Sequence, residues 1–138
     1  MTEDARFEDG ETDLARMLAT LDVSVRPGSF AFVVGPWPAL EAMAVARIDE
    51  AEGVTLVVDS SAARAAGAPV GFEAAWVTLD VHSSLSAVGL TAWFSSVLAD
   101  AGIACNVLAG FHHDHLLVPH DRADEVVGLL RSRARATR

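Results

Sequence analysis

The stretch WVTLDVHSSLSAVGLTAWFSSVLADAGIACNVLAGFHHDHLLV, residues 76–118, decides the fold, because strand, helix, strand, hairpin and strand patterns follow one another in it. Its first part alternates: Val77, Leu79 and Val81 share one face of an extended segment, and mostly polar residues share the other. That period is typical of a strand with one buried face. We therefore expect a half-buried strand over residues 76–82.

A helix and two further strands follow. Apolar residues recur at helical spacing until Gly102, a residue type that readily takes the left-handed turn past a helix end. Ser84 or Ser86 is a candidate cap for this helix. Alternation then predicts a strand over residues 103–109, and a hairpin leads back into a strand over residues 115–118.

The connection between the first two strands predicts their orientation. A strand, a crossover helix and a second strand in one sheet lie parallel, so their carboxyl ends share one edge. Two polar clusters fall at this edge, His82-Ser83-Ser84 and the His-His-Asp-His of residues 112–115. Ligands bind beyond the carboxyl ends of parallel strands, and a helix N-terminus offers N–H groups to an anion. The edge is a candidate site for the carboxylate of a small metabolite, although a helix cap and a solvated hairpin tip explain the same residues.

A metal site is a competing interpretation of the histidines. In an extended strand, His113 and His115 share a face, and His82 can approach from the end of the neighbouring strand. A carboxylate or cysteine at metal-ligand spacing is otherwise lacking, which weakens this interpretation. We therefore expect neither a resident metal nor a cofactor.

A nucleophilic enzyme is the second competing interpretation, with Ser83, Ser84 or Cys105 as the nucleophile. The nucleophile needs a base within hydrogen-bond reach, yet adjacent strand residues point to opposite faces. A Gly-x-Ser-x-Gly elbow is also missing from the sequence. Cys105 is well explained as a small core residue in a reducing compartment. We therefore expect a protein that is not an enzyme.

Composition disfavours several kinds of partner. The chain has 138 residues, 51% of them hydrophobic, and a formal net charge of −9 in which every basic residue is an arginine. Such a charge disfavours polyanions, so we expect no nucleic-acid partner. The arginines of residues 131–138 are better explained by a solvated helix end, or by an intersubunit contact with the acidic residues 3–13. With no signal peptide and no apolar run of membrane-spanning length in view, we expect a soluble, cytoplasmic protein without a membrane partner.

The first half of the chain has a similar but weaker pattern of helices and strands. Residues 39–52 fit either a helix or a strand that runs into an acidic turn. The other expected elements are a helix at residues 12–21 capped by Thr12, a turn at 26–29, strands at 29–34 and 54–58, a helix at 60–66 and a module boundary at 67–71.

The order of these elements resembles that of ACT domains. Residues 98–103 lead into the second strand of the long stretch, and residues 114–119 form its third, as in that family. More narrowly, VHSSL at 81–85, AVGLT at 87–91, Asn106-Val107 and His113-Asp114-His115 are similar to motifs of small bacterial tandem-ACT proteins of unassigned function. The EAEGVTLV of residues 50–57 is similar to the first half of that group.

The resemblance, which runs from Leu14 to Leu130, implies an α+β fold. We expect two ferredoxin-like βαββαβ modules of the ACT type, at residues 12–67 and 72–131, with tails at 1–11 and 132–138. Their sheet would be largely antiparallel and covered by helices on one face. The second module lacks the fourth strand that normally follows its second helix. The first half, for instance Val54–Val58, or a partner chain would supply that strand.

The resemblance also implies a non-catalytic regulatory protein that binds an amino acid or a related metabolite. Ser84 and the following helix start would take the carboxylate, and Asp114 the amino group. A half-polar sheet face suggests a homodimer, and a protein–protein interaction module without a ligand is an alternative. The predicted ligand-binding residues are His82, Ser83, Ser84, Leu85, Val88, Gly89, Leu90, Asn106, His113 and Asp114.

Overall fold

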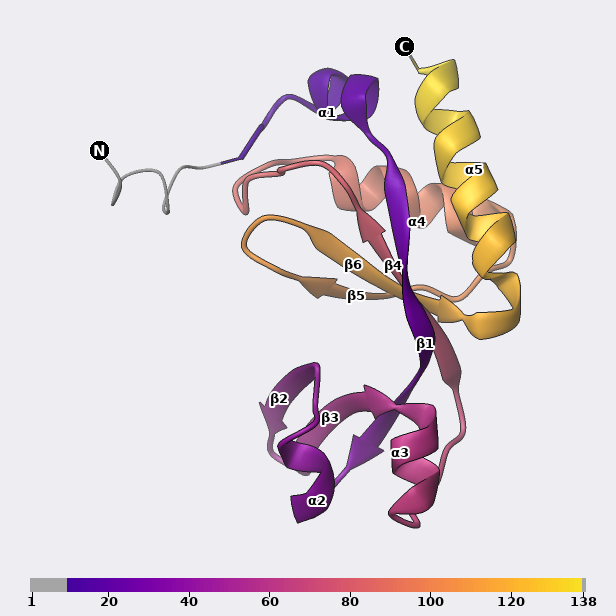
Figure 1. Ribbon diagram of the computed structural model, residues 1–138. Helices are drawn as coiled ribbons and strands as arrows, with labels where there is room; N and C mark the ends of the chain where they lie inside the picture. The colour runs from indigo at the N-terminus through magenta and orange to yellow at the C-terminus, as the bar shows by residue number, and fades with distance from the viewer. Residues whose placement is uncertain (1–9, 138) are drawn as a thin grey trace.

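Six strands form one antiparallel sheet in the order β2-β3-β1-β4-β6-β5 (Figure 1). The structure is a computed structural model and describes residues 10–137. None of the helices in this part of the chain is long and apolar enough to cross a membrane. The elements are α1 (Leu14–Thr20), β1 (Val23–Val34), α2 (Pro38–Glu41), β2 (Ala46–Glu50), β3 (Gly53–Asp59), α3 (Ser60–Ala65), β4 (Glu73–Leu79), α4 (Leu90–Asp100), β5 (Asn106–Ala109), β6 (Asp114–Pro119), the 3₁₀ turn η2 (His120–Arg122) and α5 (Ala123–Ala136).

The long strand β1 passes through both halves of the molecule (Figure 1). Its register with β4 shifts between Arg26 and Phe30, where Gly28 takes a φ of 106°. The sequence predicted a turn here and a new strand after it, which is wrong. Proline and glycine instead form a bulge within one strand, because pairing with β4 resumes beyond them.

Two βαββαβ units share β1 and β4. The first unit runs from β1 to β4 and has the strand order β2-β3-β1-β4, while the second runs from β4 to α5 and has the order β5-β6-β4-β1. The fourth strand of the second unit is therefore the start of β1, where Val23–Arg26 pair with β4. The suggestion of Val54–Val58 for this role is wrong, since that segment lies in β3 and pairs with β1 and β2. The predicted α+β, ferredoxin-like fold with two units is confirmed. The module boundaries at residues 12–67 and 72–131 stay a prediction.

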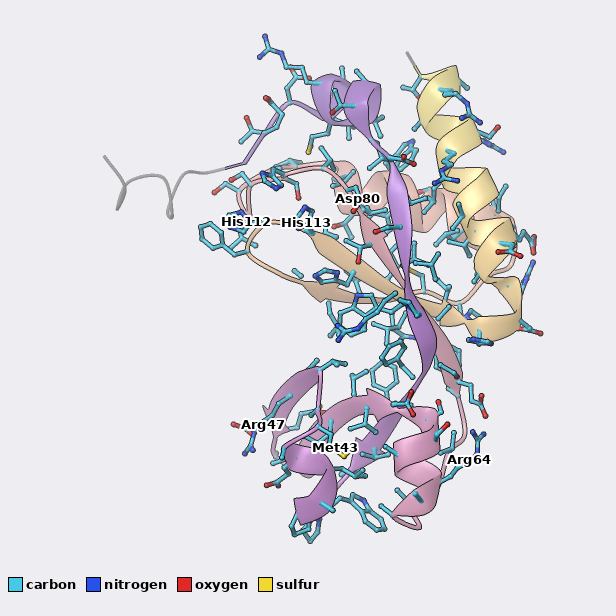
Figure 2. The ribbon with its side chains drawn as sticks, in the orientation of Figure 1. Met43, Arg47, Arg64, Asp80, His112 and His113 are labelled. Atoms are coloured by element: carbon cyan, nitrogen blue, oxygen red, sulfur yellow. The ribbon has the colours of Figure 1, made fainter. Side chains whose placement is uncertain are left out.

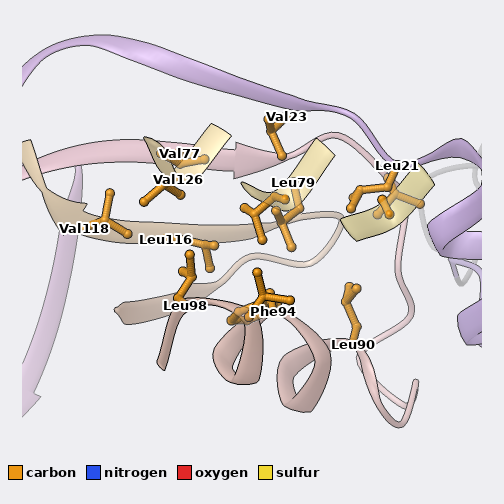
Figure 3. Packing of buried hydrophobic residues seen from close by; sticks show 14 of the residues in the cluster. Leu21, Val23, Val77, Leu79, Leu90, Phe94, Leu98, Leu116, Val118 and Val126 are labelled. Atoms are coloured by element: carbon orange, nitrogen blue, oxygen red, sulfur yellow. The ribbon is translucent and has the colours of Figure 1, made fainter. Parts of the chain in front are cut away.

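Helices cover one face of this sheet. Val77 and Leu79 of β4 point to the same side as Leu116 and Val118 of β6, and they meet the buried faces of α4 and α5 (Figure 3). On the first unit, the corresponding positions of β1 and β3 pack against α2 and α3. The opposite face carries a smaller cluster that includes Phe30, Trp76 and Leu117.

Several predicted boundaries move by a few residues. The first helix begins at Leu14, and Asp13 rather than Thr12 caps it by accepting a hydrogen bond from the Arg16 N–H at 3.1 Å. The strand expected over residues 103–109 begins only at Asn106, although Ile103 is buried in the core. The undecided residues 39–52 contain most of the short helix α2, which begins at Pro38, and all of the strand β2. Most of the acidic residues 3–13, for which a contact with the C-terminal arginines was suggested, lie outside the described part of the chain.

Candidate functional site

The predicted sheet edge forms as expected. Both β4 and β5 pair antiparallel with β6, so they lie parallel to each other and their carboxyl ends reach the same edge. A pocket of about 130 Å³ opens there. Its lining consists of Ser83, Ser84, Leu85, Ala87, Leu90, Thr91, Ala109, Gly110 and Asp114.

The loop between β4 and α4, residues 80–89, forms one wall of the pocket and is hydrogen-bonded to the beginning of the described chain. The Glu11 N–H donates to the His82 carbonyl at 2.7 Å, and the Ser84 N–H donates to the Glu11 carbonyl at 3.0 Å. These two bonds make Glu11 a short parallel bridge partner of Ser83. A Cβ at Gly10 would lie 2.5 Å from the His82 carbonyl oxygen, so only glycine fits this approach.

The same loop leads into the N-terminus of α4. Gly89 precedes the helix with a φ of 109°, and within residues 10–137 no side chain caps it. Ser84 and Ser86, the two predicted caps, instead bond to each other, since the Ser86 N–H donates to Ser84 Oγ at 3.0 Å. The N–H groups of the first turn, beside Leu90 and Thr91, are consequently available to an anionic group.

Asp114 is the charged member of the pocket lining. It starts β6 and is half-buried, and burial raises the pKa of its carboxyl above the usual value, against the opposing influence of His115 and His113. A cation in the pocket would favour the ionised carboxylate. The pocket thus brings together a carboxylate, a helix N-terminus and the buried Ser83 and Ser84.

Three imidazoles lie close together beside the pocket, and Figure 2 labels two of them, His112 and His113. The ring of His82, from the loop, lies 5.2 Å from that of His112 and 4.9 Å from that of His113, both on the hairpin. Burial lowers the pKa of His113, and the nearby His82 lowers it further. The charge of Asp80 opposes this effect.

His115 lies in a different environment, on the face of the sheet that the helices do not cover. The indole N–H of Trp76 donates to His115 Nδ1 at 3.2 Å, and Thr78 Oγ1 lies 2.9 Å from the same nitrogen. Because an indole N–H can only donate, Nδ1 must accept and the ring must be neutral. Burial lowers the pKa of His115, in agreement with this arrangement.

Five of the ten predicted ligand-binding residues line the pocket: Ser83, Ser84, Leu85, Leu90 and Asp114. His82, Val88, Gly89 and His113 belong to the same loop and hairpin but are not among the lining residues. Asn106 lies at the far end of β5, paired with Leu117, and is exposed.

The sequence did not single out Ala87, Thr91, Ala109 or Gly110, which the structure places in the lining. The hydroxyl of Thr91 in the first turn of a helix was a signal that could have found it. The other three residues carry no chemical signal of their own, because they offer only backbone groups and small side chains.

The geometry bears on the metal site and on Cys105, one of the three candidate nucleophiles. Within residues 10–137, no three His, Cys, Asp or Glu side chains come together in a way that could hold a metal ion. Burial raises the pKa of the Cys105 thiol to about 11, which disfavours the thiolate that a nucleophile requires.

The fold and the pocket define a class of protein: a tandem of βαββαβ units that share one sheet, with a small polar pocket where a loop meets a helix N-terminus. Two family models described as ACT domain match the chain, one over residues 9–75 and one over residues 72–132. The chain belongs to the ACT domain family and carries two ACT domains in tandem, as the motifs predicted. Such domains are typically ligand-binding regulatory modules.

Solved structures agree with this assignment. A protein of unknown function from Vibrio cholerae, described as a possible transport protein, is 34% identical over 88% of this chain and 95% of its own, with a TM-score of 0.78. A protein from Agrobacterium tumefaciens is 19% identical over 83% of this chain and 88% of its own, with a TM-score of 0.63. The regulatory subunit of aspartate kinase from Thermus thermophilus is 12% identical over 80% of this chain and 94% of its own, with a TM-score of 0.61. The comparison with curated proteins finds no match.

Proposed function

We propose that this chain is a non-catalytic, cytoplasmic regulatory protein that binds a small amino acid or a closely related metabolite in the pocket beside α4. The observation that carries the proposal is the composition of the lining, in which Asp114 is the charged residue and α4 offers its N-terminus. A zwitterionic amino acid has the two complementary groups. Its ammonium would pair with Asp114, and its carboxylate would meet the helix N–H groups and the Ser84 hydroxyl.

The size of the pocket limits the ligand. A volume of about 130 Å³ leaves room for a small molecule only. Leu85 and Leu90 add apolar surface to the lining, so a short uncharged side chain fits better than a long or acidic one. The name of one similar structure, a regulatory subunit, is in keeping with a function in control rather than catalysis.

The test is a thermal-shift screen of the proteinogenic amino acids, with nucleotides and divalent metal ions as comparison ligands. A ligand at 100 times its Kd stabilises the folded state by about 2.7 kcal/mol, enough to raise the melting temperature by several degrees. The shift should disappear in Asp114→Asn and Ser84→Ala, and should persist in Asp121→Asn, a matched control on the exposed turn η2. A screen in which no amino acid stabilises the protein would overturn the proposal.

We also propose a homodimer that pairs the two β5 strands. The described sheet has two edges, and they differ in charge. The β2 edge carries Arg47, Asp49 and Glu50, the kind of residues that protect an edge from pairing, whereas β5 carries no charge and exposes Val107 at 38%. A second β5 would satisfy its free backbone groups in an antiparallel, two-fold arrangement.

Sedimentation analysis of two edge variants tests the dimer. Val107→Lys should shift the protein to monomer, while Ile48→Lys, at a similarly exposed position on the β2 edge, should leave the dimer intact. A wild-type protein that stays monomeric at micromolar concentration would contradict this part of the proposal.

A further inference from the structure

The three imidazoles beside the pocket connect its two walls. His82 belongs to the loop that contributes Ser83 and Ser84 to the lining, and the other two rings belong to the hairpin that contributes Gly110 and Asp114. Figure 2 labels His112 and His113, the two hairpin members, in this region. The rings therefore meet where the loop and the hairpin meet.

We propose that His82, His112 and His113 form a proton-binding cluster that loosens the pocket when it becomes charged. Neutral imidazoles can pack in the tilted and edge-on arrangements observed, with ring centroids 4.9 to 5.2 Å apart across the two walls. Two imidazolium rings at this separation repel each other, and the repulsion acts along the line that joins loop and hairpin. Protonation thus pushes the two walls of the pocket apart.

The surroundings of His113 favour its neutral form when the walls are closed. The ring is partly buried, and His82 and His112 face it with their own positive charges when protonated. Asp80, which follows β4, and Asp114 of β6 act in the opposite direction, because their negative charges raise the pKa of His113. His115 is a further neighbour of His113, and Trp76 holds it neutral by donating to its Nδ1.

Backbone hydrogen bonds hold both walls of the pocket. The hairpin is closed by a hydrogen bond from the Gly110 N–H to the His113 carbonyl at 2.8 Å. The loop is held by the backbone bonds that join Glu11 to His82 and Ser84. Because the His82 carbonyl is itself one of these partners, a displacement of His82 acts directly on the segment that carries the buried Ser83 and Ser84. Protonation of the cluster would therefore act on the loop directly, through His82 itself.

The opening itself needs no ligand, whereas its effect on ligand binding rests on the proposed function. Closed and open forms differ in the position of Ser84, so a ligand that contacts this residue binds the closed form better. Protons and ligand then oppose each other by thermodynamic linkage. The chain would release its ligand as the pH falls and the cluster takes up protons.

NMR of the histidine rings and backbone amides, from about pH 8 to about pH 5 and with a chelator present, tests the cluster. In the wild type, His113 should titrate below the usual histidine range, and the Ser84 amide signal should move with the same midpoint. In His82→Gln, the midpoint pH of the His113 titration should rise. The Ser84 amide signal should then no longer move together with that titration. His120→Gln, which changes an exposed histidine on η2, should behave as the wild type.

Either of two results would overturn the proposed proton-binding cluster. One is a Ser84 amide signal that stays constant while the rings titrate, and the other is a midpoint pH of His113 that is unchanged in His82→Gln. A parallel thermal-shift screen of the amino acids at both ends of the pH range separates the two proposals. If no amino acid stabilises the protein at either pH, the proposed function fails, and the ring titration still decides the cluster by itself.

Discussion

Replacing Gly10 with alanine should detach the segment that holds the pocket loop. The new Cβ would lie 2.5 Å from the His82 carbonyl oxygen and 2.6 Å from the Ser83 carbonyl carbon. Both are backbone atoms, so no side-chain rotation can relieve the clash. The two hydrogen bonds that Glu11 makes with His82 and Ser84, 2.7 and 3.0 Å long, should be lost together. At about 0.5–1.5 kcal/mol for each bond, the expected loss is about 1–3 kcal/mol.

Hydrogen exchange and urea denaturation together measure this effect. The Ser84 amide should lose its protection in Gly10→Ala, and the free energy of unfolding should fall by about 1–3 kcal/mol. The matched control is Gly128→Ala within α5, where a Cβ meets nothing within 4 Å and where alanine should stabilise the helix by about 1 kcal/mol. The two substitutions are thus expected to have opposite signs. A Gly10→Ala protein with a protected Ser84 amide and an unchanged urea midpoint would refute the reasoning.

Three further predictions concern the core and the titrating groups. Phe94→Ala should lower the free energy of unfolding by about 3–5 kcal/mol in urea denaturation, because the fully buried ring leaves a cavity under the sheet; a loss below about 1 kcal/mol would contradict the described packing. Without ligand, Asp114→Asn should raise the urea midpoint at neutral pH. Folding raises the pKa of the Asp114 carboxyl, so its contribution to the free energy of unfolding is favourable below pH 3.8, the usual pKa, and is lost as the pH rises through the folded-state pKa. An increase in the urea midpoint of Asp114→Asn that is equal at all pH values would argue against this cause. With its pKa raised to about 11, Cys105 should react with iodoacetamide at pH 8 far more slowly in the native protein than in urea, and equal rates would show that the thiol is accessible and unperturbed.

The strand alternation and the crossover rule were enough to predict the edge where the pocket lies. Both are local or topological regularities, so the neighbourhood of His82 and the hairpin followed from residues 76–118 alone. Alternation tells which face of a strand a residue occupies but not how far along the strand it lies relative to a site. For this reason Asn106 was grouped with the pocket, although it lies at the opposite end of β5.

The partner of a strand was much harder to predict than the strand itself. Pro27 and Gly28 carry a strong local turn signal, yet the chain stays extended around them because β4 offers backbone partners on both sides. Those partners are about 50 positions away in the sequence, as in the pair Arg26 and Trp76. No local pattern shows such pairing, and the same gap hid the source of the fourth strand in the second unit.

The sharing of β1 and β4 has a consequence for how the protein unfolds. Each ACT unit consists of four strands, and the two units share β1 and β4. Neither unit therefore has four strands that belong to it alone. Separate expression of either half would leave a sheet with an open internal edge, so we expect one cooperative melting transition rather than two. A structural change at the pocket would then be transmitted to β3, which lies on the far side of β1, through the backbone pairing of the strands alone. The two ACT domains are thus joined in one sheet, and we expect them to unfold as a single unit.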